Sequence, residues 1–159
     1  PEWNVLDIGC GGGANVKRLL KLCPQGKVYG MDLSEESVAF ARRHNAGELD
    51  RRCFIQQGDV CSLPYGDGAF DAVTAFETVY FWSSVSKALA EVFRVIRKGG
   101  CFLISLEASD PELGKAWTER IKGMTVYGAE ELKQLLSQAG FSDIRVIQKK
   151  EELHIVAHK

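Results

Sequence analysis

The sequence is short of the features that mark several classes of protein. Among its 159 residues, 20 Lys and Arg are balanced by 21 Asp and Glu, which leaves a net charge of −1. Nucleic-acid-binding proteins usually carry a basic stripe, so this balance argues against a nucleic-acid partner. No run approaches the roughly 20 apolar residues of a membrane-spanning helix. No signal-peptide pattern precedes the first apolar segment, and we therefore expect a cytoplasmic protein.

Metal-binding and disulfide patterns are also absent. The five cysteines are scattered without CxxC spacing, and we expect reduced thiols rather than disulfides or a zinc site. The three histidines are expected at the surface, and the sequence predicts no metal site. The residues concerned are Cys10, Cys23, Cys53, Cys61 and Cys101, with His44, His154 and His158.

Short apolar runs alternate with helix-period segments along the chain. Without internal repeats, low-complexity tracts or linkers, a chain of this length is expected to form one domain, residues 1–159. Lys98-Gly99-Gly100 is expected to end the helix that begins near Val85. The pattern predicts strands at residues 5–8, 27–31, 53–57, 69–76 and 101–106, and helices at about 14–22, 34–45, 85–96 and 132–139.

The C-terminal segment has a different pattern. Apolar residues alternate with polar ones before and after a charged loop at residues 149–152, and no helix separates the two runs. Such runs are expected to pair as an antiparallel hairpin. Five strands linked by helices, followed by a hairpin, predict an α/β protein with a mostly parallel, seven-stranded sheet covered on both faces.

The most informative segment is Asp7-Ile8-Gly9-Cys10-Gly11-Gly12-Gly13, which follows an apolar strand and leads into a helix. Glycines at such a turn allow positive φ and let a ligand lie against the main chain at the helix N-terminus. This arrangement is typical of a site for an adenosine-bearing cofactor. The glycine spacing, with Asp32 about 20 residues further on, also satisfies the dinucleotide fingerprint.

Three features favour S-adenosylmethionine over a dinucleotide. Asp7 lies close to where a pyrophosphate would lie, and it would repel that anion but attract an ammonium and a sulfonium. Gly58-Asp59-Val60 follows the third predicted strand and offers a carboxylate to an adenine amino group. The closing hairpin is not expected of a nicotinamide-binding domain.

As a set, these motifs resemble class I S-adenosylmethionine-dependent methyltransferases, in the small-molecule branch that includes the ubiquinone- and menaquinone-type enzymes. The resemblance implies a Rossmann-like three-layer sandwich, S-adenosylmethionine as cofactor and S-adenosylhomocysteine as product. It spans nearly the whole chain in the family's order, through residues 5–13, 30–34, 58–60, 63–65, 70–73 and 94–100.

The resemblance also implies roles for individual residues. The glycine loop would cradle the amino-acid and ribose parts of the cofactor, Asp32 would hold both ribose hydroxyls, and Asp59 would face the adenine. Met31, Leu33 and Val60 would enclose the adenine. The expected cofactor-binding residues are Asp7, Gly9, Cys10, Gly11, Asp32, Leu33, Gly58, Asp59, Val60 and Phe76.

Methyl transfer mainly requires that nucleophile, methyl group and sulfur be aligned, so a catalytic histidine is not needed. Ligands of open α/β sheets bind at the carboxyl ends of strands, which places the acceptor next to residues 77–82. Glu77 and Tyr80 are the candidate catalytic residues. The alternative for Glu77 is a solvated acid at the strand end, and the alternative for Tyr80 is ordinary packing. An Asn/Asp-Pro-Pro-Tyr signature is absent here, which favours a small-molecule acceptor.

One departure from the family concerns the start of the chain. The family usually carries lid helices before the glycine strand, whereas this strand starts within four residues of Pro1. Either the sequence is truncated and lacks those helices, or the pocket is open, and a partner subunit in a homodimer could supply the cover. The alternatives are a catalytically silent S-adenosylmethionine-binding sensor or scaffold, a nicotinamide dehydrogenase fragment, or a purely structural domain.

Overall fold

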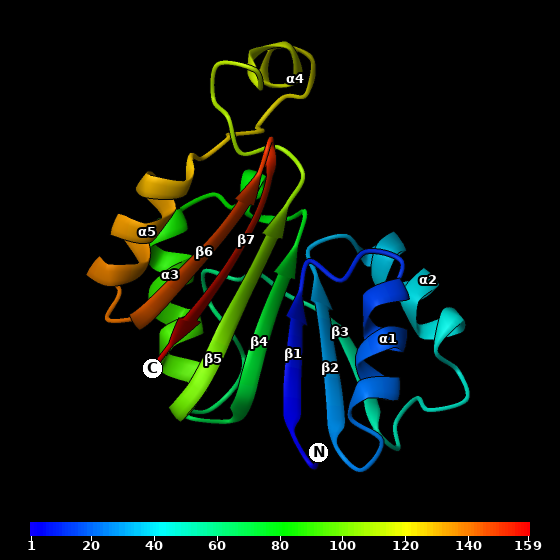
Figure 1. Cartoon of the computed structure of the whole chain (residues 1–159). Helices are drawn as coiled ribbons and strands as arrows, with labels where there is room; N and C mark the ends of the chain where they lie inside the picture. The colour runs from blue at the N-terminus through cyan, green and yellow to red at the C-terminus, as the bar shows by residue number, and fades with distance from the viewer.

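The computed structural model describes residues 1–159 and contains one seven-stranded sheet in the order β3-β2-β1-β4-β5-β7-β6 (Figure 1). The strands from β3 to β5 are parallel, and β7 is antiparallel to both β5 and β6. The predicted sheet with its closing hairpin is therefore confirmed. The strands are β1 (Asn4–Ile8), β2 (Lys27–Asp32), β3 (Cys53–Gln57), β4 (Phe70–Phe76), β5 (Ile96–Leu106), β6 (Ser142–Lys149) and β7 (Glu152–His158).

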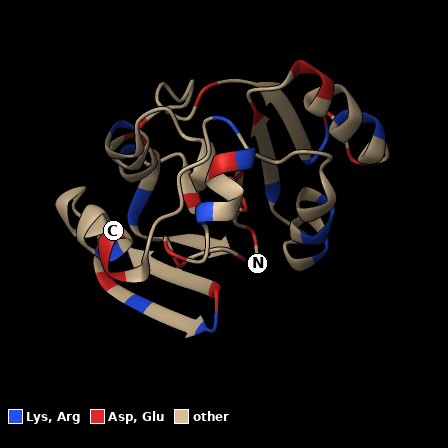
Figure 2. Cartoon of the chain, turned by 90° about the horizontal axis from the view of Figure 1, so that it is seen from above, with Lys and Arg blue, Asp and Glu red and all other residues tan.

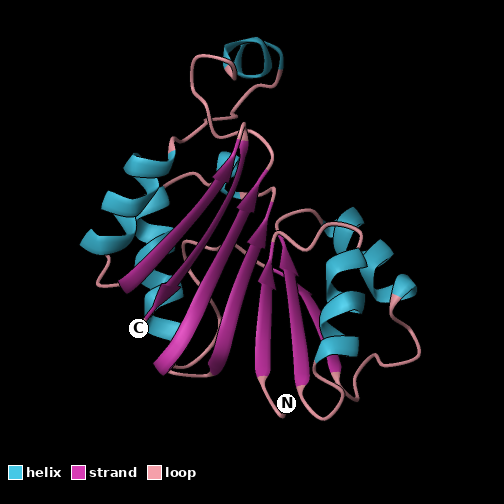
Figure 3. Ribbon diagram, in the orientation of Figure 1, coloured by secondary structure: helices cyan, strands magenta, loops and turns pink.

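Helices lie on both faces of the sheet (Figures 1 and 3). On one face α1 (Ala14–Leu22) and α2 (Glu35–His44) pack against β1, β2 and β3, and on the other α3 (Val85–Val95) and α5 (Ala129–Gln138) pack against β5 and β6. A 3-10 helix (Val79–Phe81) follows β4, and the short α4 (Lys115–Arg120) stands beyond the strand ends. None of these helices is both long and apolar enough to cross a membrane.

Local sequence explains where α2 begins and ends. The Ser34 hydroxyl accepts a hydrogen bond from the Ser37 backbone N–H at 3.2 Å, which confirms the predicted N-cap. Glu35 and Glu36 lie in the first turn and Arg42 and Arg43 in the last, so charges of both signs complement the helix dipole. The start of α2 is thereby fixed directly after the carboxyl end of β2.

The predicted end of the helix before β5 was wrong. The helix α3 ends at Val95, and the strand starts at once with Ile96, which pairs with Phe70 on β4. Gly99 has a φ of 77° within this strand, and the β4–β5 register shifts here. The buried Ile96 draws the chain into the sheet, so the Lys98-Gly99-Gly100 glycines form a bulge rather than a helix cap.

The core is unevenly divided between the two faces. A cluster of 25 buried residues, including Phe70, Phe102 and Leu136, fills the space between the sheet and α3 and α5. A cluster of 8, centred on Val16 and Val28, lies under α1 and α2. Both chain termini lie at the amino-terminal edge of the sheet, opposite the carboxyl ends of β1 to β4 (Figure 1).

Candidate cofactor site

A cleft of about 550 Å³ opens across the carboxyl ends of β1, β2, β3 and β4. This is the position at which open α/β sheets bind ligands, and the volume suits a small molecule. Of the residues predicted from the sequence, the cleft brings together Gly9, Met31, Asp32, Leu33, Gly58, Asp59, Val60 and Glu77. The other lining residues are Ile8, Ser34, Thr78, Phe81, Trp82 and Ser83.

The glycine loop between β1 and α1 has the predicted left-handed backbone. Gly9 has a φ of 68° and Gly11 a φ of 50°, both in the region that side chains disfavour. A Cβ on Gly9 would overlap the Thr78 side chain, so the loop also requires a glycine where it meets the end of β4. A Cβ on Gly11 would project into open space, which leaves that backbone accessible to a ligand.

Asp32 is held at the cleft by two backbone groups. Its Oδ2 accepts from the Gly11 N–H at 2.9 Å, and its Oδ1 accepts from the Ser34 N–H at 2.9 Å. Each carboxylate oxygen can accept a further hydrogen bond. The end of β2 therefore presents a fixed carboxylate that can receive two hydroxyl groups, next to the glycine loop.

The segment after β3 forms the opposite wall of the cleft. The Asp59 Oδ1 accepts from the Cys61 N–H at 2.8 Å, and the Gly58 N–H donates to the Asp32 carbonyl at 3.0 Å. A Cβ on Gly58 would come within 2.5 Å of the Met31 sulfur. Leu33, which is 70% exposed, lines the same part of the cleft and leaves an apolar surface free.

Asp7 lies under the glycine loop and not in the wall of the cleft. Its side chain is buried, at 1% exposure. The Thr74 hydroxyl donates to its Oδ1 at 2.7 Å, whereas its Oδ2 has no hydrogen-bond partner. Burial raises the pKa of this carboxyl from 3.8 to about 7, and Asp32 adds to the effect. An unpaired buried oxygen of this kind is costly unless a donor or a cation satisfies it.

Cys10 and Gly11 are also outside the cleft lining. Cys10 is buried, and burial raises the pKa of its thiol to about 12, so it is no nucleophile at neutral pH. Gly11 contributes through its N–H to Asp32. All five cysteines are free, as expected from their spacing.

Glu77 and Tyr80 form a hydrogen-bonded pair after β4. The Tyr80 hydroxyl donates to Glu77 Oε2 at 3.0 Å and accepts from the Ala108 N–H at 2.9 Å. Glu77 lines the cleft, but the Tyr80 ring is buried and does not, whereas Phe81 and Trp82 do. Burial raises the pKa of Glu77 above its usual range, although the Tyr80 hydrogen bond opposes this shift.

A second cavity of about 280 Å³ adjoins the end of β4 on the α1 side of the sheet. Phe76, predicted for the cofactor, lines this cavity instead of the cleft. Glu77 is the one residue common to both spaces. The remaining lining residues are Asn15, Arg18, Ser105, Leu106, Glu107, Glu152 and His154.

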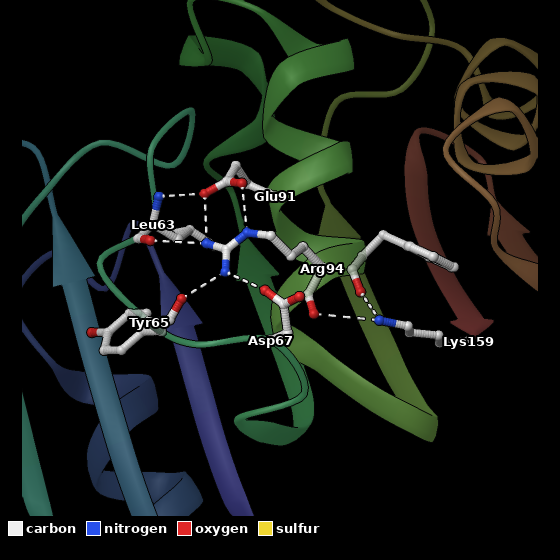
Figure 4. A network of polar contacts seen from close by, with 7 residues as sticks. Leu63, Tyr65, Asp67, Glu91, Arg94 and Lys159 are labelled. Atoms are coloured by element: carbon white, nitrogen blue, oxygen red, sulfur yellow. Dashed lines mark hydrogen bonds and ion pairs between the residues drawn. The ribbon is translucent and has the colours of Figure 1, made fainter.

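An arginine that sequence reasoning missed anchors the chain beyond Asp59 (Figure 4). The Arg94 guanidinium donates to both oxygens of Glu91, to the Leu63 and Tyr65 carbonyls, and to the Asp67 carboxylate. These contacts occupy all five of its N–H groups. The Arg94–Glu91 spacing on α3 was visible in the sequence, but the two carbonyl acceptors could not be identified without the fold.

The comparisons with known proteins agree with this geometry. The methyltransferase domain family matches residues 6–104, which is more than half of the chain. The chain belongs to this family of class I S-adenosylmethionine-dependent methyltransferases. Its predicted Rossmann-like fold is confirmed by a phosphoethanolamine N-methyltransferase from Haemonchus contortus solved with S-adenosylmethionine. That structure superposes with a TM-score of 0.85 at 18% identity, over 98% of this chain and 48% of its own.

Two curated relatives show the range of the methyltransferase family. A demethylmenaquinone methyltransferase of Symbiobacterium thermophilum is 35% identical over 70% of this chain and 45% of its own length. An O-methyltransferase of Penicillium expansum is 30% identical over 94% of this chain and 56% of its own. The chain thus spans about half the length of the curated relatives that it matches.

The residues present fit the cofactor of the methyltransferase family. The unpaired Asp7 oxygen can satisfy a cationic group, and the Asp32 carboxylate can accept from two hydroxyls. The glycine loop leaves backbone accessible between these two acids. Leu33 and Val60 supply apolar surface near Asp59, which can accept from an amino group.

Proposed function

We propose that this domain, residues 1–159, binds S-adenosylmethionine in the cleft and transfers its methyl group by in-line displacement to a small-molecule acceptor. The observation that carries the proposal is the placement of Asp32 and Asp59 beside the glycine loop, at the ends of adjacent strands, in one cleft of about 550 Å³. Asp32 matches the ribose hydroxyls of this cofactor, Asp59 matches its adenine, and the backbone of the glycine loop matches its amino-acid part.

Each predicted residue then has a binding role. Asp32 accepts from the ribose hydroxyls, and Asp59, with Gly58 and Val60, binds the adenine beside Leu33. Gly9, Cys10 and Gly11 supply the backbone around the amino-acid part, and Asp7 provides the charge opposite the ammonium group. Phe76, the last residue of β4, lines the adjoining cavity on the side from which the acceptor approaches.

The bound cofactor supplies an electrophilic methyl group on a positively charged sulfur. The chain's own contribution is to hold the nucleophile in line with that methyl group, which can provide about 7–11 kcal/mol of the barrier. Phe81 and Trp82 line the cleft on the β4 side, and their rings can exclude water from the acceptor side. Glu77 is the carboxylate closest in the chain to this aromatic wall.

A small acceptor, and not a nucleic acid, fits the charge distribution. Seen from above, Lys and Arg positions occur along the ribbon together with Asp and Glu positions (Figure 2), and the chain carries 20 Lys and Arg against 21 Asp and Glu. The relatives named as demethylmenaquinone and O-methyltransferases support the same class of acceptor.

The proposal includes a reducing, cytoplasmic location, which suits the five free thiols. It also includes a homodimer, which could cover the exposed Leu33 and Phe81 at the cleft.

Calorimetric titration with S-adenosylhomocysteine tests the cofactor assignment. We expect micromolar binding by the native chain, no binding of NAD, and an affinity reduced about 100-fold by Asp32→Ala, since two hydrogen bonds to a charged group are lost. Glu36→Ala, which removes an exposed carboxylate on α2, should change the affinity by less than about threefold. Equal losses of affinity in the two variants would contradict the assignment. A separate assay of methyl transfer distinguishes an enzyme, which turns over, from a catalytically silent sensor, which only binds the cofactor.

A further inference from the structure

Glu77 occupies the boundary between the two cavities. It lines the cofactor cleft of about 550 Å³ and also the cavity of about 280 Å³ beside it, and no other residue does both. Its φ of 55° is left-handed, a conformation that costs a non-glycine residue about 1–2 kcal/mol. The Glu77 N–H donates to the Ser105 carbonyl at 2.9 Å, which fixes this backbone to β5.

The carboxylate of Glu77 is held from the side of the core. Tyr80 is 4% exposed, and its hydroxyl is anchored by the Ala108 N–H at 2.9 Å, so that its one proton is directed to Glu77 Oε2 at 3.0 Å. A hydrogen bond from the Glu107 backbone also acts on this carboxylate and lowers its pKa. Each carboxylate oxygen has two acceptor positions, so a carboxylate oriented in this way can still bind a donor from a ligand.

The adjoining cavity is polar. Of its nine lining residues only Phe76 and Leu106 are apolar, and the groups that face Glu77 across it include Glu107 and His154. Arg18 and Glu152 complete its charged lining. A cavity of this kind suits a hydrogen-bonding molecule and would leave a long hydrocarbon chain poorly accommodated.

Building on the proposed function, we propose that Glu77 binds the methyl acceptor by accepting a hydrogen bond from the N–H or O–H of the nucleophilic atom, and that Tyr80 is its positioning residue. The body of the acceptor would occupy the adjoining cavity. The substrate class is therefore a polar amine or hydroxyl compound, and not a carbon nucleophile or a lipid.

The proton balance of the transfer follows from this placement. The lone pair of the acceptor nitrogen or oxygen forms the bond to the methyl carbon, and the carbon–sulfur bond breaks with its electron pair left on sulfur. The proton that the acceptor loses passes to the Glu77 carboxylate and then to water. A carboxyl whose pKa is raised by burial is a better proton acceptor than a fully solvated one.

The position of Glu77 can be tested without a known acceptor. The pKa of its carboxyl is measured by carbon NMR in the S-adenosylmethionine and S-adenosylhomocysteine complexes, with Glu77→Gln to assign the signal. The two ligands differ by one methyl group and one positive charge. A charge beside Glu77 should lower its pKa by about one unit in the S-adenosylmethionine complex. Equal pKa values in the two complexes would overturn the inference.

The hydrogen-bond role is tested by two ammonium probes in the S-adenosylhomocysteine complex. Methylammonium carries N–H donors and tetramethylammonium carries the same charge without them. We expect methylammonium to shift the Glu77 signal at least three times more strongly at equal concentration, and a methanol titration shows whether a hydroxyl group does the same. Equal shifts from both cations would overturn the hydrogen bond as the basis of recognition.

Two variants separate positioning from general stability. Tyr80→Phe should raise the pKa of Glu77, because the hydrogen bond that lowers it is lost, and should reduce its response to the sulfonium charge. Glu130→Gln, at an exposed carboxylate in the first turn of α5 and outside both cavities, should keep the response of Glu77 to the sulfonium charge. If Tyr80→Phe leaves both unchanged, Tyr80 is not a positioning residue. Failure of the native chain to bind S-adenosylhomocysteine would instead refute the proposed function.

Discussion

The Thr74 hydroxyl donates a 2.7 Å hydrogen bond to one oxygen of Asp7, and the other oxygen of this buried carboxylate has no partner. Thr74 and Asp7 are neighbours on β4 and β1, directly beneath the glycine loop. Within the chain alone, only one of the two oxygens of this buried carboxylate is therefore hydrogen-bonded. This arrangement has consequences for both stability and cofactor binding.

Asp7→Asn should stabilise the chain at alkaline pH. The pKa of Asp7 is about 7 in the folded chain and 3.8 in the unfolded one, so the unfolded state ionises first and folding loses stability as the pH rises from 4 to 7. The full cost above pH 7 is on the order of 4 kcal/mol, part of which an unpaired amide would retain. Urea unfolding should show a gain of about 1–3 kcal/mol at pH 8 and little gain at pH 5.

A control variant acts in the opposite direction. Thr74→Val removes the hydroxyl that lowers the pKa of Asp7, and it should therefore destabilise the chain more at pH 8 than at pH 5. If the effects of both substitutions were independent of pH, Asp7 would not titrate near neutrality.

Binding of S-adenosylhomocysteine should weaken as the pH falls through 7. The ammonium group of the ligand requires the ionised form of Asp7, whose pKa is about 7. Calorimetry should show an affinity that is level above pH 7 and falls about tenfold for each unit below it. In Asp7→Asn the affinity should be lower throughout and nearly independent of pH in this range. A persistent slope in that variant would assign the dependence to another group.

Arg94→Lys should loosen the chain between β3 and β4. An ammonium has at most three N–H donors, whereas the Arg94 guanidinium uses five, including those to the Leu63 and Tyr65 carbonyls. We expect a loss of about 1–3 kcal/mol of unfolding free energy in urea, because at least two hydrogen bonds are not replaced. The matched control is Arg97→Lys, at an exposed pair with Asp71, and it should cost less than about 1 kcal/mol. Similar losses in the two variants would show that the Arg94 network contributes little.

Glu77→Gly and Glu77→Ala should differ in stability although both remove the carboxylate. Both variants lose the Tyr80 hydrogen bond, but glycine adopts the φ of 55° without strain, whereas alanine keeps the strain. Glu77→Gly should therefore be more stable than Glu77→Ala by about 1 kcal/mol in thermal or urea unfolding. Equal stabilities would mean that the backbone relaxes to a different conformation in one of them.

The strands and the hairpin could be predicted because each carries its own local pattern. Ile144 and Val146 alternate with polar residues, and Ser34 caps α2 within three residues of the group it accepts from. The end of α3 could not be predicted in this way, because Ile96 joins the sheet through pairing with Phe70, 26 residues earlier. Helix α4 carries no strong apolar period and was not predicted.

The same distinction applies to the candidate site. The glycine loop, Asp32 and Asp59 were predicted because strand ends and turn residues can be recognised one at a time. The unpaired state of Asp7 depends on Thr74, and the orientation of Glu77 depends on Tyr80 and Ala108. These contacts form only when β4 lies between β1 and β5, so sequence spacing does not disclose them.

Both chain ends lie at the edge of the sheet opposite the cleft, and the Lys159 ammonium is bound there by the Phe93 and Arg94 carbonyls. An affinity tag, a fluorophore or a surface linker attached at either end would therefore leave the mouth of the cleft unobstructed. The domain can be immobilised in a uniform orientation for ligand screening, with the ligand-binding edge of the sheet directed into solution.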